Sequence, residues 1–109
     1  MLGTIRTVSK RDSGTQPRPD EVVIDVDRSN PILGNPFIMG RDGDRLGCIR
    51  KHNRLIKEDR ENDGPISHEL EKIAQMVRAG QNVALRCWCA PKQCHADNYV
   101  KKIVKMVTR

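Results

Sequence analysis

Aromatic residues are scarce in this chain: Phe37, Trp88 and Tyr99 are the only three among 109 residues. A core must therefore be filled mainly by aliphatic side chains. A platform that stacks the bases of single-stranded nucleic acid is disfavoured, because it needs several exposed rings. Long apolar runs are missing as well. No stretch approaches the roughly 20 residues that a membrane-spanning helix requires, which excludes a membrane protein.

The first residues, MLGTIR, lack the apolar segment of a secretory signal. We therefore expect a cytoplasmic protein that has no contact with a membrane. What the chain does contain is charge, with 20 Lys and Arg against 14 Asp and Glu and a net charge of +6. This excess favours an anionic partner, either a small molecule or a nucleic acid. Nothing in the composition indicates an oligomeric state.

The length favours one domain. Residues 1–20, with prolines and scattered charge, predict a flexible N-terminal arm, and residues 21–109 predict a single domain. The pattern beyond the arm predicts a strand at 21–27, an irregular loop over 28–44, helices at about 45–60 and 67–80, a strand at 83–87 and a helix at about 93–106. This order is typical of an α/β fold with a small, mostly parallel sheet flanked by about three helices.

Three of the four cysteines, Cys87, Cys89 and Cys94, fall in one short segment, LRCWCAPKQCH, that ends in His95. A disulfide-stapled domain would instead spread its cysteines to close long loops, so we expect thiols in a reducing compartment. The segment runs from a predicted strand into a predicted helix. A thiol or an anion at the start of a helix is stabilised by the exposed N–H groups and the helix dipole.

Three interpretations of this segment compete. The first is a zinc site formed by Cys87, Cys89, Cys94 and His95, although the C-x-C-x4-C-H spacing differs from the paired C-x2-C of common zinc modules, so zinc is less favoured than no cofactor. The second is a nucleophilic or redox cysteine, with Cys89 as the thiol and His95, six residues on, as base or anion donor. The third is ordinary core packing, which is the preferred interpretation for the isolated Cys48.

The loop after the first predicted strand carries a second group of candidates. In a parallel sheet the carboxyl ends of the strands share one edge, so this loop should meet the cysteine segment there. Two of its arginines, Arg28 and Arg45, would bind a phosphate or carboxylate. Asn-Pro and Asp-Gly pairs are equally typical of ordinary turns, however. The predicted ligand-binding residues are Arg28, Asn30, Asn35, Phe37, Asp42 and Arg45.

The two segments together resemble the family catalogued as domain of unknown function 4326. Its pattern is approximately W-G-N-P-F and C-W-C-x-P-x-x-C-H-G-D, which residues 34–37 (GNPF) and 87–97 (CWCAPKQCHAD) resemble here, and the similarity spans roughly Val22 to Val104. This chain has Leu33 in place of the usual aromatic and Ala96 in place of the usual glycine, and both differences would alter ligand fit. The cysteine end is also similar to another uncharacterised family whose motif ends in C-H-R. The resemblance implies a phage or bacterial origin, hence the host cytoplasm for a phage protein, and a pocket shared by both motifs.

Two functions follow from these observations, and the residues do not decide whether the chain is an enzyme. The first is a pocket for an anionic ligand, such as a nucleotide or a nucleoside-derived substrate. Asp97 would orient His95 or accept a proton there, so the predicted catalytic residues are Cys89, Cys94, His95 and Asp97. The alternative is a basic module that binds nucleic acid or a host protein, in which the Cys/His cluster is structural or binds zinc.

Overall fold

The computed structural model describes residues 1–11, 15–88 and 94–108. It is a single α/β domain, which confirms the predicted fold class. The elements in chain order are β1 (Ile5–Ser9), β2 (Glu21–Asp25), α1 (Arg45–Glu61), α2 (Pro65–Arg78), β3 (Asn82–Cys87) and α3 (His95–Val107). Within the described part of the chain, no helix is long and apolar enough to cross a membrane.

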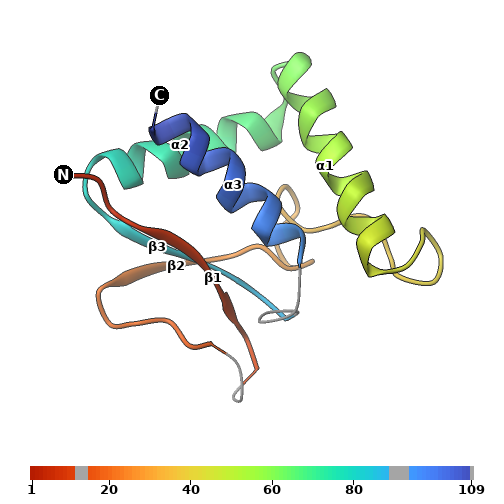
Figure 1. Ribbon diagram of the computed structural model, residues 1–109, viewed down its shortest axis with the longest axis horizontal. Helices are drawn as coiled ribbons and strands as arrows, with labels where there is room; N and C mark the ends of the chain where they lie inside the picture. Colours follow the sequence, from red (N-terminus) through yellow and green to blue (C-terminus); the bar gives the residue numbers. More distant parts are fainter. Residues whose placement is uncertain (12–14, 89–93, 109) are drawn as a thin grey trace.

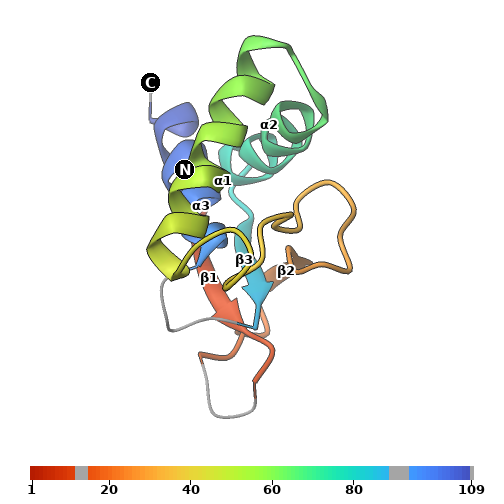
Figure 2. The same cartoon turned by 90° about the vertical axis from the view of Figure 1, so that its right-hand side faces the viewer.

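The three strands form a parallel sheet in the order β1-β3-β2. Side chains alternate between the faces of a strand, so Val83, Leu85 and Cys87 of β3 share one face, and all three are buried in the core. Helices α2 and α3 pack on the sheet, while α1 packs on these two helices (Figure 1). Figure 2 shows the same arrangement from the side. The core therefore lies between one face of the sheet and the helical layer.

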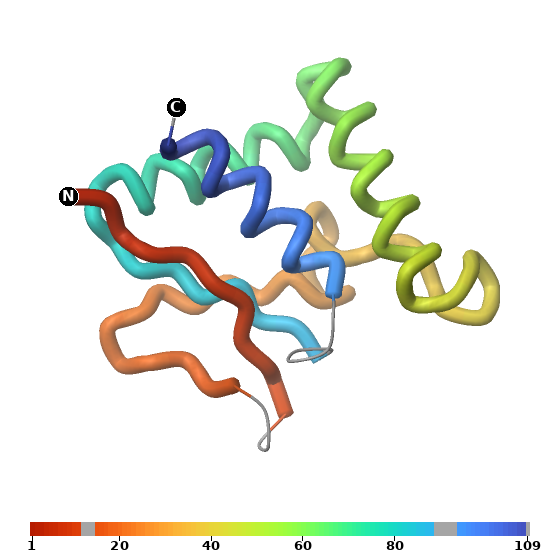
Figure 3. The backbone as a smooth tube through the Cα atoms, in the orientation of Figure 1, coloured from red at the N-terminus to blue at the C-terminus, as the bar shows by residue number. Residues whose placement is uncertain are grey.

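The prediction of a flexible arm over residues 1–20 is wrong for the stretch that forms β1. Ile5–Ser9 pairs with β3 over its whole length, and Gly3 N–H donates to Val77 O (2.8 Å) just before it. Figure 3 shows this segment running beside β3. The strand was missed because IRTVS is short and half polar, and its hydrogen-bond partners lie almost 80 residues later in the chain.

The other elements begin and end close to their predicted positions. Asp44 caps α1, and its Oδ1 accepts from Gly47 N–H (2.8 Å). Helix α2 begins at Pro65, two residues before the predicted Ser67, because proline suits the first helical turn, where no backbone donor is needed. Gly80 follows α2 with φ +92°, which is the left-handed conformation predicted for it. Helix α3 begins at His95, and its N-cap is Cys94.

Candidate functional site

The loop after β2 and the end of β3 line one pocket of about 460 Å³ at the carboxyl edge of the sheet. The described residues of the loop after β2 and of the cysteine segment share this pocket. They do so because β2 and β3 are parallel neighbours, so the segments that follow the two strands leave the sheet at the same edge. The start of α1 and the start of α3 complete the walls. The lining residues are Asp27, Arg28, Ser29, Asn35, Phe37, Ile38, Met39, Arg45, Cys48, Ile49, Cys87, Trp88, Cys94 and His95.

The pocket contains both predicted cations and several apolar side chains. Arg28 and Arg45 line it, and Arg28 Nη2 donates to Phe37 O (3.1 Å), which holds the guanidinium against the loop. Trp88 and Met39 also line it and are each 53% exposed. The pocket therefore offers positive charge together with unburied aromatic and aliphatic surface.

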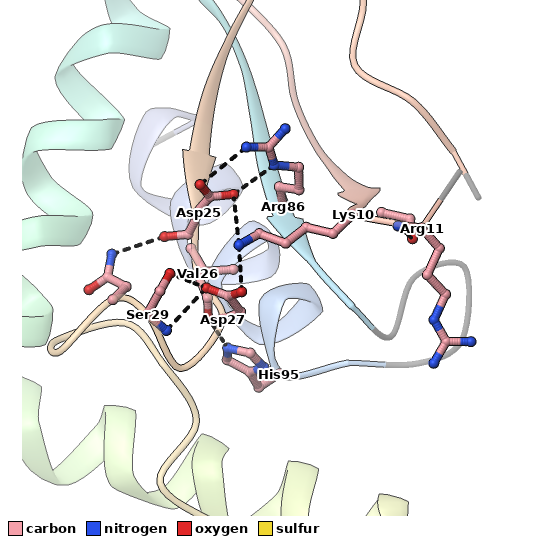
Figure 4. A network of polar contacts seen from close by, with 10 residues as sticks. Lys10, Arg11, Asp25, Val26, Asp27, Ser29, Arg86 and His95 are labelled. Atoms are coloured by element: carbon pink, nitrogen blue, oxygen red, sulfur yellow. Dashed lines mark hydrogen bonds and ion pairs between the residues drawn. The ribbon is translucent and has the colours of Figure 1, made fainter. Parts of the chain in front are cut away.

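One acidic side chain, Asp27, also lines the pocket, and its charge is already compensated. Burial disfavours the charged form, but hydrogen bonds from Lys10 (2.6 Å) and from Ser29 outweigh it and lower the pKa of Asp27 to about 2. Figure 4 shows Lys10 between Asp25 and Asp27, with Arg86 on the far side of Asp25. Lys10 Nζ also lies 5.7 Å from the centre of the Trp88 ring. Because Lys10 and Ser29 bind Asp27, its negative charge does not offset the positive charges of Arg28 and Arg45.

Two of the predicted ligand-binding residues hold the loop together and are not among the residues lining this pocket. Asn30 accepts from the N–H groups of Ile32 (2.9 Å) and Leu33 (2.8 Å) at Oδ1, and its Nδ2 donates to Asp25 O (3.0 Å). Asp42 accepts from Ile38 N–H (2.9 Å) and pairs with Arg41. Both side chains stabilise turns, which is the ordinary interpretation that the sequence also allowed.

Asn35 and Phe37, two of the predicted ligand-binding residues, both line the pocket. Asn35 Oδ1 accepts from Phe37 N–H (3.0 Å), which forms a local turn in the Gly-Asn-Pro-Phe segment. This bond uses the side-chain carbonyl of Asn35. The two residues thus contribute to the wall of the pocket and to its shape.

Cys87, Cys94 and His95 form a sulfur-rich corner of the pocket, and all three residues are buried. Cys87 Sγ lies 2.8 Å from Cys94 Sγ, and Cys94 Sγ lies 3.3 Å from His95 Nδ1. His95 Nε2 contacts the carbonyl oxygens of Val26 (2.6 Å) and Leu33 (3.2 Å). Cys89, predicted as a nucleophile and as a metal ligand, lies outside the described residues.

The family can now be assigned. The family model described as domain of unknown function (DUF4326) matches residues 8–105. This protein is a member of the domain of unknown function 4326 family. The match runs from β1 almost to the end of α3 and so includes both walls of the pocket. No curated protein and no solved structure matches the chain.

The two departures of this family member from the family pattern lie in the core. Leu33 is 1% exposed and Ala96 is fully buried, and neither is among the residues that line the pocket. Any effect of these two differences on ligand fit would therefore act through the packing behind the pocket. Leu33 contributes instead through its backbone carbonyl, which contacts His95.

Asp97, the predicted partner of His95, caps a helix in this family member. Its Oδ2 accepts from Cys94 N–H (3.0 Å) at the start of α3, and within the described contacts it makes no hydrogen bond to the imidazole. The two backbone carbonyls orient His95 instead. Asp97 still raises the pKa of His95 through its charge, but burial has the larger effect and lowers that pKa below its ordinary value.

A buried chain of hydrogen bonds behind the pocket was not predicted. Asn98 Nδ2 donates to His52 Nδ1 (3.2 Å), so His52 Nε2 carries the hydrogen and donates to Tyr99 Oη (2.9 Å). Tyr99 Oη in turn donates to Leu33 O (3.0 Å). Burial, and secondarily the repulsion that a protonated His95 would exert, lowers the pKa of His52 to about 3, so this ring is neutral. A histidine in a polar helix pattern gives no sign in the sequence that it will be buried.

Within the described residues of this family member, no group of three or more His, Cys, Asp and Glu side chains is arranged to hold a metal ion. The sulfurs of Cys87 and Cys94 are 2.8 Å apart, whereas two thiolates on one tetrahedral zinc, each bonded at about 2.3 Å, would be roughly 3.8 Å apart. Cys89 belonged to the predicted zinc set and is not among these residues.

Proposed function

We propose that this protein binds an anionic small molecule with a planar ring, such as a nucleotide or a nucleoside-derived phosphate, in the pocket between the loop after β2 and the end of β3. The observation that carries this proposal is the meeting of Arg28 and Arg45 with Phe37 and Trp88 in one pocket, although the two segments lie far apart in the sequence. A volume of about 460 Å³ is within the range of pockets that hold small ligands.

The two kinds of side chain suit two parts of such a ligand. A guanidinium group binds phosphate or carboxylate with two parallel hydrogen bonds and keeps its charge at any physiological pH. Aromatic and thioether side chains such as Trp88 and Met39 offer an apolar surface to a flat ring, which would cover part of their exposed area. The site also lies at the carboxyl edge of a parallel sheet, where open α/β folds commonly bind their ligands.

The test compares nucleoside monophosphates with the matching nucleosides by isothermal titration calorimetry. We expect at least one monophosphate to bind more tightly than its nucleoside, and Arg45→Ala to weaken that binding about tenfold or more, since a charge-assisted hydrogen bond is lost. Arg50→Ala is the matched control, because Arg50 is an exposed arginine of α1 outside the pocket lining. Equal affinity for nucleoside and nucleotide, or equal loss in both variants, contradicts the proposal.

A second candidate function, binding of nucleic acid, is favoured by a separate basic groove. The groove has a volume of about 740 Å³ and is lined in part by Arg60 of α1 and by Lys102 and Lys105 of α3. Burial and then the charges of Lys105, Arg60 and Lys57 lower the pKa of Lys102. These cations repel one another, and phosphate groups that neutralise them would relieve the repulsion.

Salt dependence distinguishes this function from the first. Duplex binding by the second route weakens steeply with salt, and replacing Lys102 and Lys105 by Gln reduces the slope of log affinity against log salt by up to about 2. Lys51→Gln together with Arg54→Gln removes two charges from α1 outside both pocket linings and provides the control. If both double variants change the slope equally, the groove has no special role and only net charge matters.

A further inference from the structure

The hydrogen bonds of His95 fix which of its nitrogens carries the hydrogen. Nε2 contacts two backbone carbonyl oxygens, at 2.6 Å and 3.2 Å, and a carbonyl oxygen only accepts. Nε2 therefore carries the hydrogen. With Nε2 as the donor, Nδ1 of the neutral ring has a lone pair, and burial favours the neutral ring because it lowers the pKa of His95. That lone pair faces Cys94 Sγ at 3.3 Å, which makes the thiol the donor of this contact.

The position of Cys94 favours its thiolate in two further ways. Cys94 is the N-cap of α3, a helix of 13 residues, so its sulfur lies at the positive end of the helix dipole. Cys87 Sγ is 2.8 Å away and supplies an S–H group that can donate to a negatively charged sulfur. Cys94 is 2% exposed but lies in the pocket wall, so a molecule in the pocket reaches it without crossing the core.

We infer that Cys94 is a nucleophile activated by His95, and that it bonds covalently to an electrophilic carbon of the molecule held in the pocket. In this step the Cys94 S–H bond breaks and its proton passes to His95 Nδ1. The sulfur electron pair forms the new S–C bond, and the leaving group departs with the electrons of the bond that breaks. The carbonyls of Val26 and Leu33 then hold the resulting imidazolium through its Nε2–H group. The identity of the electrophile as an anionic ligand rests on the proposed function, whereas the reactivity of Cys94 does not.

The test measures alkylation of each cysteine by iodoacetamide under a phosphine reductant. The thiol sulfur displaces iodide, and the proton passes first to His95 and then to water. Trypsin cleavage separates Cys94 (residues 93–101) from Cys48 (residues 46–50), so peptide mass spectrometry gives both rates from one sample. Cys48 is the internal control, because it is 3% exposed and lines the same pocket but hydrogen-bonds to Gly43 O and not to a histidine. We expect Cys94 to react at least tenfold faster than Cys48.

The variant His95→Gln retains an N–H donor near the carbonyl of Val26 but removes the base. We expect it to slow the reaction of Cys94 at least tenfold and to leave that of Cys48 unchanged. Equal rates for Cys94 and Cys48 in the unaltered protein overturn the inference even if the variant does not fold. An unchanged Cys94 rate in a folded His95→Gln protein also overturns it.

Iodoacetate separates this inference from the proposed function, because it carries the negative charge that iodoacetamide lacks. If the two arginines attract anions, the alkylation rate of Cys94 with iodoacetate rises relative to its rate with iodoacetamide, and Arg45→Ala lowers this ratio of rates. Fast reaction with both reagents and no effect of Arg45→Ala supports the nucleophile and contradicts the anion pocket. Slow reaction with both reagents contradicts the nucleophile, while nucleotide titration still tests the pocket independently.

Discussion

At the scale of single residues, Tyr99 connects the core to the pocket. It is fully buried, its ring meets the rings of His52 and His95 edge to face, and its hydroxyl donates to Leu33 O. Because Leu33 O also contacts His95, one carbonyl of the loop after β2 is shared by two side chains of α3. The loop is thereby fastened to the helix that positions the sulfur-rich corner.

We predict that Tyr99→Phe lowers the free energy of unfolding by about 1–3 kcal/mol, because it removes a buried hydroxyl and leaves the Nε2–H of His52 without its acceptor. Urea denaturation followed by circular dichroism measures the change. Thr108→Val is the control, since it removes an exposed hydroxyl that donates to Val104 O, and its effect should stay within about 0.5 kcal/mol. Equal effects of the two changes would show that burial of the hydroxyl has no importance.

Residue types alone could not separate ligand-binding side chains from side chains that shape the backbone. Asn30, Asp42 and Asp97 were all predicted to take part in the site, and each accepts backbone N–H bonds in a turn or at a helix start. Short polar side chains are favoured in both settings for the same reason, which is their ability to accept hydrogen bonds at close range. Arg28, Arg45 and His95 line the pocket, where the parallel pairing of β2 and β3 brings together the segments that carry them.

At the scale of elements, the helices were predictable because their signals are local. Helix α1 begins after Asp44 and α2 ends before Gly80, and both signals depend only on neighbouring residues. Strand β1 gave no such signal, because IRTVS lacks the three consecutive β-branched residues that mark β2. The loop predicted over 28–44 has nearly its observed extent. Its internal turns were not predictable, because they depend on which backbone N–H groups have no partner in a helix or strand.

We predict that Asp44→Ala lowers the free energy of unfolding by about 1 kcal/mol, because Gly47 N–H at the start of α1 loses its acceptor. Asp44→Ser retains an acceptor at the same place and should remain within a few tenths of a kcal/mol of the original protein. Thermal denaturation of the three proteins gives the comparison. A Ser variant as unstable as the Ala variant would mean that the carboxylate charge, and not the cap, is what matters.

At the scale of the whole molecule, the buried histidines make stability depend on pH. The pKa of His52 is about 3 in the folded protein and about 6.5 in an unfolded chain, and burial lowers the pKa of His95 as well. Between these values the unfolded chain binds more protons than the folded protein. The free energy of unfolding therefore falls as the pH decreases from about 6.5.

We predict that the free energy of unfolding falls steadily between pH 6.5 and 4.5, by up to about 1.4 kcal/mol per pH unit for each buried histidine. The urea midpoint, measured at each pH, falls with it. Below about pH 4.5 the carboxyl groups of Glu21 and Asp27 bind protons in the unfolded chain but not in the folded protein, where their pKa values are about 2. This difference lowers the free energy of unfolding further. His52→Gln should flatten the slope in the upper range. His68→Gln should leave it unchanged, because His68 is an exposed surface residue paired with exposed Asp63. A flat midpoint from pH 6.5 to 4.5 in the unaltered protein would contradict the assignment.

The order of the strands has a consequence for synthesis on the ribosome. The central strand, Asn82–Cys87, is made last, while both of its neighbours emerge some 60 to 80 residues earlier. Until residues 82–87 have been synthesised, β1 and β2 lack the strand that lies between them, and their backbone groups remain available to other chains. Such late, long-range pairing is typical of slow folding and of a need for protection by chaperones.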